Sequence, residues 1–319
     1  MADRRDTLAR ALDTIDAGDG NGWLFLNAAL LPGDLLAQAA HEQGFRPDYL
    51  TLKRTGRDVS PNVEGGGYVG VALLLTRARK LDEINLARAW NTLAPGAPLV
   101  VCGAKTDGIG AVRKLCATRT PIEASLSKNH AVAFTLHREG GDWPLPEVEP
   151  GPDGLLRPPG TFSADGPDSG STLLLEHLDA LGTLGRVADL GAGWGHLARA
   201  VSQRGSAALH LYEADHAALE AARANVPGAT HHWHDVAGEP IAERFDAIVM
   251  NPPFHRGRAA DPALGQAFIA RAREILVSGG RLLMVANRQL PYEATLDHHF
   301  RRHERLAQEK GFKVLMATA

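Results

Sequence analysis

The stretch Phe245-Asp246-Ala247-Ile248-Val249-Met250-Asn251-Pro252-Pro253-Phe254-His255 joins a short apolar run to a pair of prolines. The apolar run is typical of a buried parallel strand. Two consecutive prolines can neither donate to a sheet ladder nor continue a helix, so the strand must end here. Open α/β sheets place their ligand sites at this carboxyl edge. The loop offers one amide side chain, backbone carbonyls and one aromatic ring, a set that suits holding a planar group with an amine.

Strand-like and helix-like segments alternate along the rest of the chain, and this alternation predicts an α/β fold with a mostly parallel sheet. Before residue 140 we expect strands at 23–26, 49–52, 68–76, 98–103 and 131–136, and helices at 35–41, 80–93 and 109–117. After residue 160 we expect strands at 186–190, 208–212, 245–250, 281–286 and 312–317, and helices at 173–181, 196–204, 217–225, 263–276 and 296–307.

A proline-rich segment divides the chain into two parts. Six prolines between 144 and 159 lie among glycines and acids without periodicity, which is typical of an extended connector. We therefore predict a first domain at 1–140, a linker at 141–159 and a second domain at 160–319. Segments 87–102 and 270–285 both have the pattern of a helix, a glycine turn and a buried strand. The first domain is therefore a candidate second copy of the fold of the second domain. An ordinary helix–turn–strand unit would look similar.

The copy, if real, is degenerate. Its apolar strand runs into Thr76-Arg77-Ala78-Arg79 rather than a proline loop, and no Gly-x-Gly turn follows 23–26. The sequence thus predicts two tandem Rossmann-like domains, of which the first has a structural or substrate-holding role.

The composition excludes several classes of protein. The chain has 319 residues with 44% hydrophobic and 22% charged residues, and its net charge of −3 argues against wholesale coating of a polyanion. Two cysteines exclude a disulfide framework and indicate a reducing compartment. The sequence has no signal-peptide pattern and no apolar run of membrane-spanning length, so we expect a cytoplasmic protein without a membrane partner.

A glycine-rich turn follows the predicted strand at 186–190, in the sequence Asp189-Leu190-Gly191-Ala192-Gly193-Trp194-Gly195. Gly191 and Gly193 would let the backbone approach a ligand closely. The dinucleotide fingerprint requires a different glycine spacing. Asp189 would repel a pyrophosphate but can accept hydrogen bonds from an ammonium group or its waters.

Two more acids follow the next strands. Glu213 is placed to accept the hydroxyls of a ribose, with Asp215 a less favoured candidate, and Asp235 could accept from the amine of an adenine. Each of the three acids could alternatively cap a turn, but three acids at successive strand ends before a proline loop favour a ligand site.

These motifs identify a resemblance to the class I S-adenosylmethionine-dependent methyltransferases over residues 160–319. The glycine turn, Glu213, Asp235 and the Asn-Pro-Pro-Phe loop match that family's motifs in order. The last motif belongs to enzymes that methylate an exocyclic or amide nitrogen. The resemblance therefore implies S-adenosylmethionine as the cofactor.

The sequence is most similar to the bacterial guanine-N2 methyltransferases of small-subunit ribosomal RNA (RsmC-like). Shared features are the segments 160–163, 168–171, 285–292 and 312–314 and a duplicated, inactive first domain. The resemblance implies a partner, ribosomal RNA or the small ribosomal subunit, and further cofactor contacts from Phe162, Ser163, Asp168 and Ser171. Arg256 departs from the small or acidic residue expected after the loop, and this leaves the substrate contacts open.

The residues suggest a mechanism that depends on alignment. The Asn251 side-chain oxygen and the Pro252 carbonyl would accept the two amine protons, and Phe254 would stack on an extruded base. Such a displacement needs no metal and no nucleophilic cysteine, and the histidines at 231, 232, 234, 298, 299 and 303 lack a metal-ligand pattern. His255 would contact the base or close the loop.

Other functions remain open at this point. The same chemistry could act on a large-subunit ribosomal RNA guanine, on the N6 of an adenine in DNA or RNA, or on a protein glutamine. A non-catalytic nucleotide- or RNA-binding assembly factor is the alternative from a different class.

Overall fold

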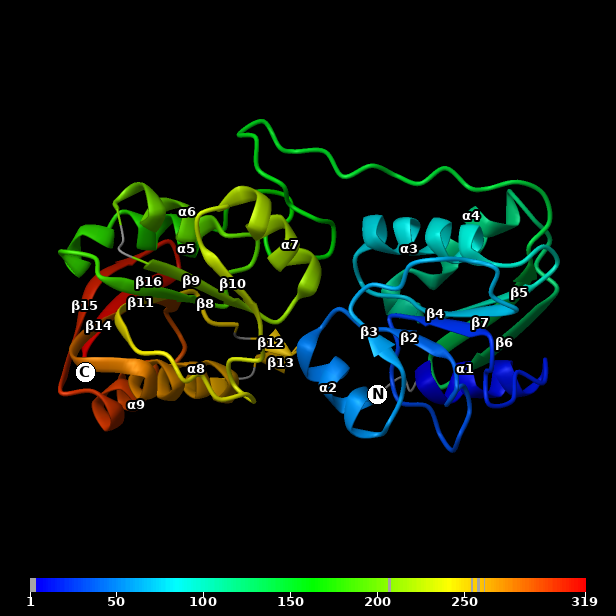
Figure 1. The fold of residues 1–319 in the computed structure, drawn as a ribbon, viewed down its shortest axis with the longest axis horizontal. Coiled ribbons are helices and arrows are strands. Elements are labelled where there is room, and N and C mark those ends of the chain that lie inside the picture. Colours follow the sequence, from blue (N-terminus) through cyan, green and yellow to red (C-terminus); the bar gives the residue numbers. More distant parts are fainter. Residues whose placement is uncertain (1–3, 206–207, 254, 257–258, 261) are drawn as a thin grey trace. The chain divides into compact units, whose positions relative to one another are not determined.

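The computed structural model describes residues 4–205, 208–253, 255–256, 259–260 and 262–319. The chain forms two compact units, Met1–Val148 and Glu149–Ala319. Each unit is a seven-stranded sheet with helices on both faces (Figure 1). In the connecting segment, Trp143 stacks on Trp90 of the first unit, and Leu155 clusters with Trp194 of the second. No helix in the described ranges is long and apolar enough to cross a membrane.

The first unit has the strand order β3-β2-β1-β4-β5-β7-β6. Leu8 and Leu12 of helix α1 pack on one face of this sheet with Phe25, and Trp90 of α3 and Val112 of α4 pack on the other. The strands are β1 (Trp23–Leu26), β2 (Ala40–Glu42), β3 (Val59–Ser60), β4 (Gly70–Leu74), β5 (Pro98–Ala104), β6 (Ala124–Lys128) and β7 (Ala131–His137). The helices are α1 (Arg4–Asp13), α2 (Arg46–Arg54), α3 (Arg79–Thr92), the 3-10 turn η1 (Lys105–Asp107) and α4 (Ile109–Ala117).

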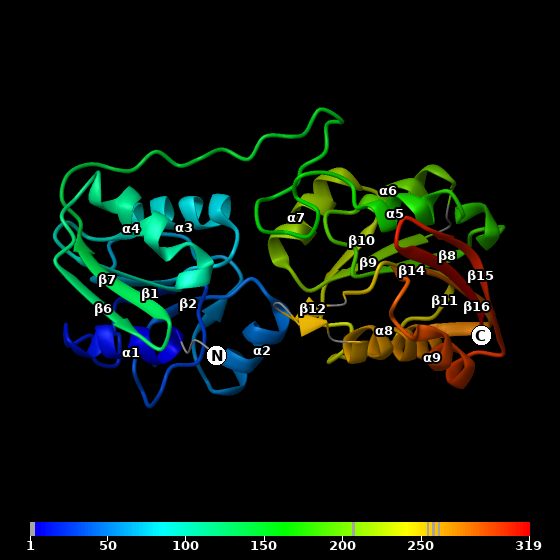
Figure 2. The same ribbon diagram turned by 180° about the vertical axis from the view of Figure 1, so that it is seen from behind.

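The second unit has the order β10-β9-β8-β11-β14-β16-β15, with a separate hairpin of β12 and β13. Helices α5, α6 and α7 cover one face of the sheet, and α8 and α9 cover the other, which can be followed from behind in Figure 2. The strands are β8 (Arg186–Leu190), β9 (Ala208–Glu213), β10 (Thr230–Trp233), β11 (Phe245–Met250), β12 (His255–Arg256), β13 (Ala259–Ala260), β14 (Leu276–Asn287), β15 (Arg302–Glu309) and β16 (Phe312–Thr318). The helices are α5 (Ser169–Leu175), η2 (Leu178–Leu181), α6 (His196–Gln203), α7 (His216–Asn225), α8 (Pro262–Ile275) and α9 (Tyr292–His299).

The two sheets have the same topology. When the strands of each seven-stranded sheet are numbered in chain order, both sheets have the order 3-2-1-4-5-7-6. In both sheets the seventh strand runs antiparallel to its two neighbours, the fifth and the sixth. The prediction of two tandem Rossmann-like domains is thereby confirmed. The repeat inferred from 87–102 and 270–285 corresponds to α3–β5 and α8–β14.

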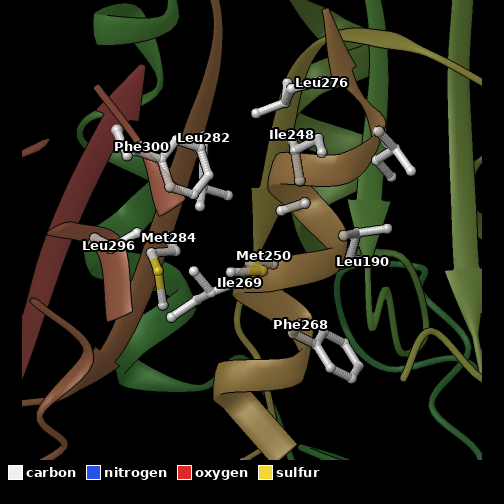
Figure 3. Packing of buried hydrophobic residues seen from close by; sticks show 14 of the residues in the cluster. Leu190, Ile248, Met250, Phe268, Ile269, Leu276, Leu282, Met284, Leu296 and Phe300 are labelled. Carbon is white, nitrogen blue, oxygen red and sulfur yellow. The ribbon is translucent and has the colours of Figure 1, made fainter. Parts of the chain in front are cut away.

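The core of the second unit fixes the strand that carries the proline loop. Met250 at the end of β11 packs with Met284 of β14, Ile269 of α8 and Leu296 of α9, and all four are fully buried (Figure 3). Burial of each such side chain contributes about 1.5–3 kcal/mol. The end of β11 is therefore held in place by long-range packing on the face opposite to α5 and α6.

Three expected elements are wrong. The segment expected as a helix at 35–41 contains Leu36 with a φ of 55° and leads into strand β2. The expected strand 49–52 is part of helix α2, whose one buried residue is Leu52. The expected helix 296–307 ends at His299, and edge strand β15 follows. Leu36 and Leu52 pack in the core of the first unit, and β15 pairs with β16, so contacts beyond the local pattern decide these elements.

Candidate active site

Three neighbouring parallel strands bring the predicted motifs to one edge of the second sheet. Leu190 at the end of β8 pairs with Met250 of β11 on one side and with Tyr212 of β9 on the other. The residues that follow these strand ends are the glycine turn, Glu213 and Asn251. The parallel register therefore places all three motifs side by side.

The glycine turn has a backbone that other residues rarely adopt. Gly191, Gly193 and Gly195 have φ values of 76°, 56° and 89°. Gly191 N donates to Tyr212 O at 2.8 Å, and Gly193 N donates to Glu213 Oε2 at 2.7 Å. A Cβ added at Gly193 would meet no atom within 4 Å, so this residue is glycine for its backbone conformation and faces open space.

Asp189 lies beneath the turn and is completely buried. Its Oδ2 accepts a hydrogen bond from Ala198 N of α6 at 3.0 Å, whereas no described residue donates to Oδ1. Burial, with a further contribution from the charge of Glu213, raises the pKa of Asp189 to about 8. A donor or a positive charge near Oδ1 would stabilise the carboxylate.

Glu213 links the glycine turn to the start of α7. Its two oxygens accept from Gly193 N and Asp215 N, both at 2.7 Å. Burial raises its pKa to about 7. Each carboxylate oxygen keeps a second lone pair that a ligand hydroxyl could use. Asp215 caps α7 by accepting from Ala217 N and Ala218 N.

Asp235 follows β10, the strand next to β9. Its Oδ1 accepts from Ala237 N at 3.1 Å, and its own N–H donates to Glu239 at 2.9 Å. The side chain therefore caps the turn after β10, which is the alternative role that the sequence left open.

Asn251 is held from the opposite side of the pocket. Its Nδ2 donates to Asp168 Oδ2 at 2.8 Å and to Ser171 Oγ at 2.9 Å. Asp168 also accepts from Ser171 N at 2.9 Å and thus caps α5. Residues 80 or more positions apart in the sequence are thereby joined in one hydrogen-bonded group.

An open pocket lies between Asn251, the start of α5 and the glycine turn, and its space of about 370 Å³ includes solvent at its mouth. Phe162 lies at this pocket with 59% of its surface exposed, and Ser163 beside it has a φ of 58°. Seven of the predicted site residues line it, namely Phe162, Ser163, Asp168, Ser171, Gly191, Gly193 and Asn251. Asp189, Glu213 and Asp235 do not line it.

The rest of the proline loop is described in part. Pro252 is buried, and His255 is the first residue of strand β12, which pairs with β13. Phe254, which we expect to stack on a base, lies outside the described residues. The positions of Asn251 and Pro252 are nonetheless set by β11 and its core.

Sequence reasoning did not predict four residues of the pocket lining, namely Ala192, Trp194, His196 and Leu197. Trp194 is 3% exposed and is covered by the guanidinium of Arg157, 4.6 Å from its ring centre. His196 begins α6; burial and the nearby charge of Arg157 lower the pKa of its ring, and Nε2 has no partner among the described residues. Its position directly after the glycine turn was the available clue.

One group of side chains in the described ranges has ligand atoms close enough for a metal ion, namely His210, His232 and Glu243, within 4.8 Å of one another. The two imidazole nitrogens lie 3.1 Å apart, the distance of an N–H···N hydrogen bond. Tyr212 donates to Glu243 at 3.3 Å. None of these three residues lines the pocket.

Comparison with known proteins identifies the family. The model of the methyltransferase small domain family matches residues 154–316. Ribosomal RNA small subunit methyltransferase C of Klebsiella pneumoniae is 41% identical over 251 residues, covering 73% of this chain and 70% of the relative. Its counterpart in Pseudomonas aeruginosa is 30% identical over 319 residues, covering 92% and 95%. The chain belongs to the ribosomal RNA small subunit methyltransferase C family.

A solved structure of this family supports the same assignment over both units. The T. thermophilus 16S rRNA N2 methyltransferase (RsmC), in complex with AdoMet and guanosine, aligns with a TM-score of 0.81 and 25% identity. The alignment covers 93% of this chain and 87% of that one. The family resemblance and the fold predicted from the sequence are confirmed.

Proposed function

We propose that this protein transfers a methyl group from S-adenosylmethionine to the exocyclic N2 of a guanine in 16S ribosomal RNA. The names of its relatives and the ligands of the T. thermophilus structure support this activity. The observation that carries the proposal is the orientation of Asn251. Its amide nitrogen is engaged by Asp168 and Ser171, which leaves the oxygen to accept from a substrate amine.

The open pocket would hold the cofactor. Gly193 faces open space and would allow its close approach, and Glu213, which accepts from Gly193 N, would also accept from the ribose hydroxyls. Phe162 and Ser163 would cover it from the loop before α5. The buried carboxylate of Asp189 would help to balance the positive charge of the cofactor. We keep Asp235 as the adenine-side acid, although its carboxylate caps a turn in this structure.

When bound, S-adenosylmethionine supplies a methyl carbon that a nitrogen lone pair can attack. Asn251 Oδ1 and the Pro252 carbonyl would accept the two protons of the guanine amine. This arrangement holds the nitrogen and directs its lone pair at the methyl group, so alignment supplies most of the catalysis. The amine nitrogen would gain the methyl carbon as the bond from that carbon to the cofactor sulfur breaks, and one amine proton would leave to solvent. Phe254 would stack on the extruded base.

The first unit would hold RNA without catalysing transfer. At the end of β4, the position that corresponds to Asn251, the Leu75 carbonyl accepts from Arg4 Nη1 at 2.6 Å. Arg4 also pairs with Asp107 at 3.3 Å, and Arg77 lies 3.5 Å from the same carboxylate. Arg4 of the first unit thus already donates to a backbone carbonyl at the position where a substrate amine would have to bind. We propose the boundaries 1–140, 141–159 and 160–319 for the first domain, linker and catalytic domain.

The proposal is tested with purified protein, labelled S-adenosylmethionine, and deproteinised 16S or 23S RNA or assembled small subunits. We expect N2-methylguanosine in 16S RNA by nucleoside analysis. Asn251→Ala should reduce transfer at least about 100-fold, since removal of one preorganised group of this kind costs about that much. Cofactor affinity measured by calorimetry should stay within about threefold, because alanine leaves the glycine turn intact. N6-methyladenosine as the product would refute the guanine assignment, and equal loss of transfer and cofactor binding would refute the site.

A further inference from the structure

The nitrogen of the Asn251 side-chain amide donates hydrogen bonds to two acceptors of the protein. Nδ2 lies 2.8 Å from Asp168 Oδ2 and 2.9 Å from Ser171 Oγ. Asp168 precedes α5 and Ser171 belongs to its first turn, where it is 6% exposed. An amide nitrogen has two protons to donate, and the oxygen of the same amide can only accept. Both donor positions of Asn251 are therefore assigned to the protein itself.

The two ends of an asparagine amide have nearly the same shape, so only the partners decide which end faces which way. A turn of the Asn251 amide by 180° would place its oxygen against the Asp168 carboxylate, with two acceptors facing each other and no proton between them. Hydrogen bonds to an ionised acceptor are about twice as strong as neutral ones. The carboxylate therefore selects the orientation that turns Oδ1 away from it.

Asp168 is itself held in place. Its Oδ2 accepts from Ser171 N, and its backbone carbonyl accepts from Thr172 Oγ1 at 3.0 Å. The first turn of α5 packs closely on β16, because a Cβ added at Gly170 would lie 2.8 Å from the Phe312 ring. Because these contacts fix Asp168, its carboxylate can determine the orientation of the Asn251 amide.

We propose that Asp168 is a positioning residue, which orients the Asn251 amide so that Oδ1 remains the acceptor for a substrate amine proton. This inference rests on the proposed function, because that function gives the oxygen its partner. It gives Asp168 a role in addition to the cofactor contact that the resemblance implies. Ser171 supports the same orientation with its hydroxyl oxygen.

The proposal is tested with variants that swap the hydrogen-bond donor and acceptor between positions 251 and 168. Asn251→Asp alone puts a second carboxylate beside Asp168, and we expect kcat to fall at least about 100-fold because both groups are acceptors. Addition of Asp168→Asn restores one donor and one acceptor, with the donor now at position 168. The double variant should have a kcat at least about tenfold above that of Asn251→Asp, a coupling expected only of residues in contact.

Two single variants separate positioning from structural support. Asp168→Ser keeps an N-cap side chain for α5 but removes the carboxylate, so kcat should fall about tenfold while KM for RNA stays within about twofold. Asp179→Ser is the matched control, because it removes a carboxylate that is 89% exposed and does not line the pocket, and kcat should stay within about twofold. Thermal melting and cofactor titration identify variants with altered folding. A double variant that melts and binds cofactor normally, yet is no faster than Asn251→Asp, refutes the proposal.

A measurement without substrate tests the positioning role of Asp168 independently of the proposed function. In the ligand-free protein, the side-chain N–H₂ resonances of Asn251 are assigned by their loss in Asn251→Ala. Their hydrogen exchange should be at least about tenfold faster in Asp168→Ser than in the wild type, because the charged acceptor of one N–H has been removed. Equal exchange in the two proteins contradicts the positioning role even if 16S RNA is the substrate. If another RNA is methylated, the proposed substrate fails and the exchange comparison still stands.

Discussion

Replacement of Asp189 by asparagine should change how the stability of the protein depends on pH. The Asp189 side chain is completely buried, its Oδ2 accepts from Ala198 N, and Oδ1 has no partner among the described residues. Burial raises its pKa from 3.8 to about 8. The Asp189→Asn substitution removes the titrating group, because an amide is neutral at every pH in this range, and it keeps an oxygen that can accept from Ala198 N.

The direction in which stability changes with pH depends on whether the folded or the unfolded state binds the Asp189 proton more tightly. Because the folded-state pKa lies above the unfolded value, the folded protein holds the proton more tightly than the unfolded chain does. The stability that this provides is complete below pH 4 and is lost as the pH rises to about 8. Each pH unit in this window costs the ligand-free wild type up to about 1.4 kcal/mol. From pH 5.5 to 7.5 the advantage of Asp189→Asn should therefore grow by up to about 3 kcal/mol.

Urea unfolding of ligand-free wild type and Asp189→Asn at pH 5.5, 6.5 and 7.5 measures this difference. Titration of groups that do not interact with Asp189 is common to both proteins and cancels in the comparison. Asp179→Asn is the control, because the Asp179 side chain is 89% exposed and should show no such trend. If the free energies of unfolding of wild type and Asp189→Asn run parallel over this range, the buried carboxylate does not titrate as the structure indicates and the reasoning is wrong.

Two further predictions concern residues that support the lining of the pocket. Gly170→Ala should lower the free energy of unfolding by about 1–3 kcal/mol, because its Cβ would lie 2.8 Å from the Phe312 ring, and a melt that matches wild type would contradict this packing. Affinity for S-adenosylmethionine should rise between pH 6 and 8, because the carboxylate form of Glu213, whose pKa burial raises to about 7, is the better acceptor for ribose hydroxyls. Calorimetry should find a flatter pH dependence in Glu213→Gln, and equal slopes would remove Glu213 from the site.

Elements whose local pattern agrees with their packing were predictable. Helix α4 spans Ile109–Ala117 and strand β8 spans Arg186–Leu190, as the sequence predicts, since both have a clear apolar period and glycine boundaries. The predicted strand at 49–52 is wrong because three apolar residues in a short segment also fit a helix, and α2 begins at Arg46 with Pro47 in its first turn. Strand β15 was missed because its exposed charged residues have no apolar alternation and it depends on pairing with β16.

The sequence by itself determined the family, the fold and the chemical type of the site. These depend on short contiguous motifs, such as Asn251-Pro252-Pro253-Phe254 and the glycine turn, whose backbone requirements are local. Tertiary structure alone decided that Asp168 faces Asn251, 83 positions away, and that Asp189 lies fully buried with one oxygen unpartnered among the described residues. Orientation and desolvation depend on which distant groups surround an atom, and a local pattern does not contain that information.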